Sequence, residues 1–113
     1  FTFYTSLNPC GISIQQPRQQ LMRIRNKFTT EVEMRMPNEN AVLVSLCKIW
    51  AAKEAIFKYA PFVGVSFIED ITLYDILDNY HWQFHLSNAG ETEIINIGFR
   101  EIGDSWLAFT LID

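Results

Sequence analysis

The residues best suited to chemistry lie between Trp50 and Lys58. On a helix, Trp50, Glu54 and Lys58 recur at every fourth position and so share one side. A carboxylate one turn from an ammonium can hold a metal ion beside an anionic phosphate, because Mg²⁺ prefers one or two carboxylates plus substrate phosphates. An ordinary alternative stays open, since a Glu–Lys pair at this spacing also stabilises a helix surface by about 0.3–0.5 kcal/mol.

The helix that must carry this segment follows from the apolar periodicity. Asn38 is a good N-cap for a long helix from Glu39 to about Tyr59, and Pro61 ends it. The apolar arc of this helix is wide, which predicts packing against a sheet. After Pro61 the pattern alternates, with turn residues at 78–79, 88–90 and 103–104. It predicts four strands in an antiparallel meander: Ile71–Ile76, Tyr80–Leu86, Thr92–Arg100 and Trp106–Ile112.

The sequence of the first third of the chain predicts two strands and two helices. Phe1–Ser6 and Cys10–Gln15 are rich in strand-forming residues, and Asn8-Pro9 separates them with a turn. Pro17 suits the first residue of a helix through residue 28, because the N–H it lacks needs no partner there. A short helix over residues 31–35 follows, since Thr30 has the capping-box spacing to a glutamate.

The order of these elements predicts an α+β fold in which one long helix packs on an antiparallel sheet. The 113 residues are expected to form a single domain, and 49% hydrophobic residues suffice for a core. No apolar run approaches the ~18 residues of a membrane helix, so no membrane partner is expected. The net charge of −4 is unevenly divided, at +4 over residues 1–60 and −8 over residues 61–113. A basic first half suits an anionic ligand or an acidic partner, although chance sorting explains it equally well.

The histidines and cysteines do not indicate a metal site. His81 and His85 share one face of a predicted strand, but they lie ~13 Å apart, too far for one metal ion. Cys10 and Cys47 have no further ligands around them for zinc, and two free thiols in a reducing cytoplasm are expected. The sequence has no nucleic-acid-binding motif that combines basic and aromatic residues, so no nucleic acid partner is expected.

The segment Trp-x-x-Lys-Glu-Ala-x-x-Lys, from Trp50 to Lys58, resembles a signature of the 4′-phosphopantetheinyl transferase superfamily. Gly11–Gln15 occupies the place of the family's Gly-Ile-Asp-x-Glu motif, and residues 17–33 and 64–67 also look like the family. The resemblance implies a cytoplasmic, Mg²⁺-dependent transfer of 4′-phosphopantetheine from coenzyme A. The acceptor is a serine of an acyl or peptidyl carrier protein, which attacks the β-phosphate and releases 3′,5′-ADP, as in holo-acyl-carrier-protein synthase of fatty acid or polyketide biosynthesis.

The resemblance also implies roles for individual residues. Glu54 is expected to bind Mg²⁺ and, with Lys58, to form the catalytic pair. Lys53 and Lys58 are expected to bind the phosphates of coenzyme A, and Gly11 is expected to bind coenzyme A by allowing its close approach to the backbone. The residues expected to face the acidic carrier protein are those of the basic helix: Arg18, Arg23, Arg25 and Lys27.

The first motif departs from the family at both acidic positions. Ser13 and Gln15 stand where the family has its other two metal ligands, and they bring no charge to attract Mg²⁺. The sequence starts at Phe1, too late to contain the family's upstream Ser-His segment. A C-terminal half completed by missing upstream sequence or by a homo-oligomer is therefore expected. Two alternatives stay open: an impaired member that binds a carrier protein or nucleotide as an assembly module, and an unrelated, hot-dog-like binding domain.

Overall fold

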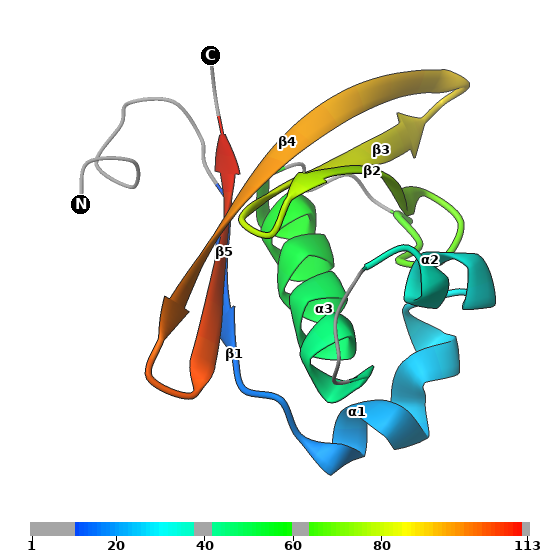
Figure 1. The fold of residues 1–113 in the computed structure, drawn as a ribbon. Coiled ribbons are helices and arrows are strands. Elements are labelled where there is room, and N and C mark those ends of the chain that lie inside the picture. The colour runs from blue at the N-terminus through cyan, green and yellow to red at the C-terminus, as the bar shows by residue number, and fades with distance from the viewer. Residues whose placement is uncertain (1–10, 38–41, 60–63, 112–113) are drawn as a thin grey trace.

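The computed structural model of the protein describes residues 11–37, 42–59 and 64–111. A five-stranded antiparallel sheet in the order β1-β5-β4-β3-β2 is packed against a long helix, α3 (Figure 1). The predicted fold class, a long helix on an antiparallel sheet, is therefore confirmed. The elements in chain order are β1 (Ile12–Gln15), α1 (Gln19–Ile24), the 3₁₀ turn η2 (Arg25–Lys27), α2 (Glu31–Arg35), α3 (Val42–Tyr59), β2 (Ile71–Asp78), β3 (His81–Asn88), β4 (Glu91–Ile102) and β5 (Ser105–Leu111).

The predicted meander forms from β2 to β5, with each strand within a few residues of its expected bounds. The β3–β4 turn places Ala89 at φ 53° and Gly90 at φ 82°. Two consecutive residues with positive φ make the turn whose twist matches antiparallel strands, and glycine adopts this conformation without a steric cost. The turn residues therefore fix the register that aligns Asn88 with Glu91.

The core lies between α3 and one face of the sheet. Alternate residues of β3 and β4 point toward the helix, as a half-buried strand requires. Ten residues of α3 are buried, including Leu46, Ile49 and Ile56, so this helix is enclosed on most of its circumference. The strand residues that complete the core are Ile71, Leu73, Trp82, Phe84, Leu86, Ile95, Ile97, Phe99, Trp106 and Ala108.

One cation lies inside this core. The Lys48 ammonium is fully buried and donates to the Asn79 carbonyl at 2.8 Å. It also lies 4.7, 5.0 and 4.6 Å from the ring centroids of Trp82, Phe99 and Trp106. A cation over aromatic faces is attracted by the ring quadrupole, so three rings take over part of the solvation that Lys48 loses.

The predicted start of α1 at Pro17 is wrong, because Arg18 has an extended backbone (φ −133°, ψ 145°) and takes the N-cap position. The helix begins at Gln19 and its last turn tightens into η2, before Phe28. The predicted capping box is confirmed. The Thr30 hydroxyl accepts the Glu33 N–H, and the Glu33 carboxylate accepts the Thr30 N–H.

Some predictions lie outside the described residues: the strand Phe1–Ser6, the turn Asn8-Pro9, the N-cap Asn38, the helix end at Pro61 and the state of Cys10. Cys47 is a buried free thiol. Within the described ranges, α3 and the shorter helices lack the length and apolarity needed to cross a membrane.

Candidate functional site

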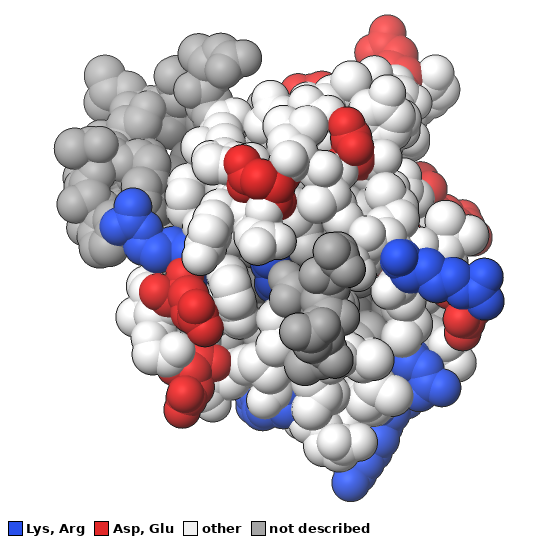
Figure 2. Space-filling view, viewed as in Figure 1, with Lys and Arg blue, Asp and Glu red and all other residues white. Residues whose placement is uncertain are grey.

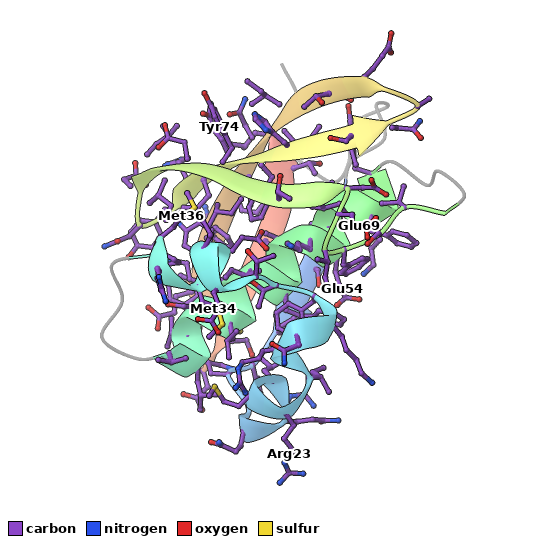
Figure 3. All side chains as sticks on the ribbon, turned by 90° about the vertical axis from the view of Figure 1, so that its right-hand side faces the viewer. Arg23, Met34, Met36, Glu54, Glu69 and Tyr74 are labelled. Carbon is purple, nitrogen blue, oxygen red and sulfur yellow. The ribbon has the colours of Figure 1, made fainter. Side chains whose placement is uncertain are left out.

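The site begins where β1 lies against α3. Residues 13 and 15 alternate along β1 and pair with Ala108 and Trp106 of β5, so both side chains point to the face of the sheet that α3 covers. Glu54 projects from α3 toward this edge, where it contacts β1, and it is labelled beside α3 in Figure 3. The strand and the helix thus bring together three positions, with Gln15 and Glu54 39 residues apart in sequence.

Ser13, Gln15 and Glu54 form a hydrogen-bonded cluster. The Gln15 amide Nε2 donates to Glu54 Oε1 at 2.5 Å, and the Ser13 hydroxyl donates to the same oxygen at 3.4 Å. Gln15 Nε2 also lies 3.4 Å from Ser13 Oγ. An N–H bond to a carboxylate is charge-assisted and roughly twice as strong as a neutral one. The carboxylate is therefore held by uncharged donors from β1.

The donor set of this cluster does not fit a Mg²⁺ centre. A divalent ion needs oxygen atoms with lone pairs directed at it and negative charge nearby. Here two of the three side chains are neutral and direct an N–H and an O–H at the carboxylate of the third. In the ranges that the structure describes, no group of three or more His, Cys, Asp or Glu residues is arranged to hold a metal.

Lys58 lies one helical turn beyond Glu54 and is exposed. Its ammonium donates to the Ile12 carbonyl at 3.2 Å, so the side chain lies along β1, beside the cluster. The ordinary i,i+4 ion pair with Glu54 does not form, because each side chain has turned to β1 instead. The ion pairs among described residues are Arg35–Glu31, Lys53–Glu33 and His81–Asp78.

Lys53 lies on the other side of α3 and is 0% exposed. Its ammonium contacts Glu33 at 3.0 Å and donates to the carbonyls of Phe28 at 2.7 Å and Phe67 at 2.6 Å. Burial lowers the pKa of Lys53, and the Glu33 carboxylate opposes this shift. All three ammonium protons have partners within the fold, so this geometry gives no support to the predicted contact of Lys53 with coenzyme A.

Glu33 is the acid most able to replace a missing metal ligand, but its position excludes this role. Its carboxylate accepts the backbone N–H of Leu73 at 2.8 Å and pairs with Lys53. It is 3% exposed and lies among α2, α3 and β2. The sequence held a signal for this pair, because Ile49, Ala52, Lys53 and Ile56 share one apolar arc and place the lysine on the buried side.

Close packing against α3 explains why residue 11 is a glycine. A Cβ on Gly11 would collide with the backbone carbonyl of Ala55 on α3. Its own N–H donates to Thr110 Oγ1 at 2.9 Å, which anchors the start of β1. The close backbone approach predicted for Gly11 is therefore an approach to α3, and this geometry gives no support to its predicted contact with coenzyme A.

The basic residues follow β1 directly, on the connection to α1 and on the helical turns after it. Arg18, Arg23 and Lys27 are at least partly exposed, whereas Arg25 folds back and donates to the Met22 carbonyl at 2.5 Å. Figure 2 shows blue side chains over the lower right, where Figure 1 places α1 and α2. In Figure 3 Arg23 points away from the body of the molecule.

The remaining reactive side chains have local roles. His81 Nδ1 contacts Asp78 at 2.9 Å, and His85 stacks on Tyr74 with ring centroids 4.2 Å apart. Burial raises the pKa of the Cys47 thiol to about 11, against the opposing charges of Arg18 and Lys48, so it is protonated at neutral pH and a poor nucleophile.

Comparison with known proteins gives one family. A family model described as the 4'-phosphopantetheinyl transferase superfamily matches residues 9–110, which is nearly the whole chain. No curated protein matches the sequence. The matched range includes the β1 cluster, the basic turns of α1 and the whole of α3.

Proposed function

The chain belongs to the 4'-phosphopantetheinyl transferase superfamily, and from this premise we propose that it binds an acidic acyl or peptidyl carrier protein without Mg²⁺-dependent transfer. Members of this superfamily generally use coenzyme A, Mg²⁺ and a carrier protein. The observation that carries the proposal is the cluster in which Gln15 and Ser13 donate to Glu54. Ser13 and Gln15 stand at the two positions where the resemblance implies acids, so one negative charge remains where three are expected.

The basic surface supports carrier recognition. Arg18, Arg23 and Lys27 are accessible on the segment that follows Gln15, so the positive charges begin three residues after the cluster. A carrier protein that places its serine at the cluster would therefore meet these charges with its own acidic surface. Complementary charges of this kind raise the association rate and exclude partners of the wrong sign.

Phosphopantetheine transfer by this chain is the second candidate. It is favoured by Glu54 and Lys58, which stand at the positions the family uses and lie beside β1 as the resemblance implies. Transfer would require negative charge at the cluster from outside the described residues, because Glu33 is committed to Lys53.

Calorimetry with an apo carrier protein in low salt tests the proposal. We expect micromolar binding that weakens steeply as salt rises, and no mass increase of the carrier when coenzyme A and Mg²⁺ are added. Arg23→Glu should weaken binding about fivefold, an effect of about 1 kcal/mol typical of an exposed charge. Arg100→Glu is the matched control, because it makes the same change in net charge at an exposed position of β4.

The outcomes separate the candidates. A mass increase of the carrier, abolished by Glu54→Ala, would establish transfer and replace the first proposal. Equal weakening by Arg23→Glu and Arg100→Glu would mean that net charge, and not the α1 surface, governs binding. Absence of binding at low salt would overturn carrier recognition.

A further inference from the structure

The Gln15–Ser13–Glu54 cluster has an electrostatic consequence for any ligand of this site. Glu54 Oε1 already accepts two hydrogen bonds, the shorter at 2.5 Å. A cation that approached this oxygen would meet the Gln15 N–H first. To bind at Oε1, it would have to displace that donor. At either carboxylate oxygen it would find one negative charge where three acids would supply three.

The neighbouring groups reinforce this arrangement. Ser13 is 4% exposed and its hydroxyl is committed to the cluster, so its oxygen cannot turn freely to a metal. Lys58 places a positive charge along the same strand through the Ile12 carbonyl, and the Cys47 thiol donates to the Gln15 carbonyl. A second cation at this edge would be repelled by the Lys58 ammonium, whereas a phosphate would be attracted by it.

We infer that this site is cation-independent: the Gln15 amide and the Ser13 hydroxyl occupy the place of a metal ion against Glu54. Coenzyme A, the ligand that the family implies for Lys58, would then bind with no divalent cation. This inference rests on the site of the proposed function and not on carrier recognition. A failure of carrier binding would leave it standing. If the inference holds, the residue types at positions 13 and 15 decide whether the site binds a metal ion.

The direct test uses a metal alone. Mn²⁺ serves as the paramagnetic probe for Mg²⁺, and its free concentration is followed by electron paramagnetic resonance in titrations with the full chain. The wild type is expected to bind no more Mn²⁺ than its exposed acids do non-specifically. Ser13→Asp with Gln15→Glu is expected to raise the Mn²⁺ affinity at least tenfold, because three carboxylates then converge.

The matched control is Gln16→Glu with Gln19→Glu, which adds two charges at exposed positions next to the cluster. It is expected to leave Mn²⁺ affinity within twofold of wild type. Should the two added acids prevent folding of the first variant, Gln15→Glu alone gives the same test with a smaller expected rise. Circular dichroism confirms that each variant is folded.

A second arm measures coenzyme A binding by calorimetry with Mg²⁺ and with EDTA. The wild-type dissociation constant is expected to change less than twofold, whereas that of the variant carrying Ser13→Asp and Gln15→Glu should depend on Mg²⁺. Three results would overturn the inference. They are specific Mn²⁺ binding by the wild type, loss of wild-type coenzyme A binding in EDTA, and no gain of Mn²⁺ affinity on adding the two acids.

Discussion

Lys53 and Glu54 are adjacent in the sequence, yet they belong to two networks on different sides of α3. Lys53 is fully buried and pairs with Glu33, joining α3 to α2, β2 and the loop before β2. Glu54 is half-buried and accepts hydrogen bonds from the uncharged donors of β1. One network is a charged pair enclosed by the fold, and the other is a charge at the edge of a site.

The difference shows how one motif serves both stability and binding. Successive residues of a helix point about 100° apart, so Lys53 and Glu54 face different surroundings although they are neighbours. A buried charge is tolerated only when a partner of opposite charge and further hydrogen bonds replace water. A partly exposed carboxylate has no such requirement. Its partners can therefore differ, as Ser13 and Gln15 do here, while the fold is retained.

The largest expected effect comes from breaking the buried pair. Lys53→Met keeps most of the length of the side chain but leaves the Glu33 carboxylate buried without a counter-charge and two carbonyls without a donor. We expect a loss of about 3–5 kcal/mol in the free energy of unfolding, measured by urea denaturation. The control is Arg35→Met, which removes the exposed partner of Glu31 at 3.9 Å and should cost less than about 0.5 kcal/mol. Equal losses for the two variants would contradict a special role for the buried pair.

A smaller effect is expected on the other side of the helix. Glu54→Gln keeps an oxygen that Gln15 and Ser13 can still donate to, and water reaches the rest of the side chain. The expected loss is about 1 kcal/mol, the difference between a charge-assisted and a neutral hydrogen bond. Glu33→Gln makes the same chemical change against the buried Lys53 ammonium and should cost several times more. The comparison between the two networks would fail if both variants unfolded at the same urea concentration.

Sequence patterns predicted the architecture well because its causes are local. Alternation over residues 71–111 and the turns near Asn88 and Gly103 depend on neighbouring residues, and the meander forms as expected. The capping box at Thr30 is equally local. The start of α1 was less predictable, because the preference of Pro17 for a first helical position competes with the extended conformation of Arg18.

The proximity of the two motifs was predictable from the sequence, but the contacts of their side chains were not. The motifs lie on β1 and α3, which pack together, yet the direction in which each side chain turns depends on tertiary packing. Gly11 and Lys53 both have the residue types expected for a phosphate site, but the Ala55 carbonyl and the Glu33 carboxylate occupy their surroundings. From the sequence, residue 15 could be recognised only as lacking the expected negative charge. Its hydrogen bond to Glu54 could not be predicted.

The smallest effect is expected at Asp78, an exposed carboxylate that belongs to neither network. Asp78 accepts the backbone N–H of Tyr80 at 2.7 Å and contacts His81 at 2.9 Å, and these bonds, that to the Tyr80 N–H most of all, lower the pKa of Asp78. A carboxyl whose pKa falls on folding stabilises the folded state above its unfolded pKa of about 3.9, and this contribution is lost as pH falls through the lower folded value. Asp78→Asn cannot titrate. The difference in unfolding free energy between wild type and this variant should therefore be constant near neutral pH and shrink below about pH 4. A difference that stays constant down to about pH 2 would show that the charge of Asp78 does not stabilise the β2–β3 turn.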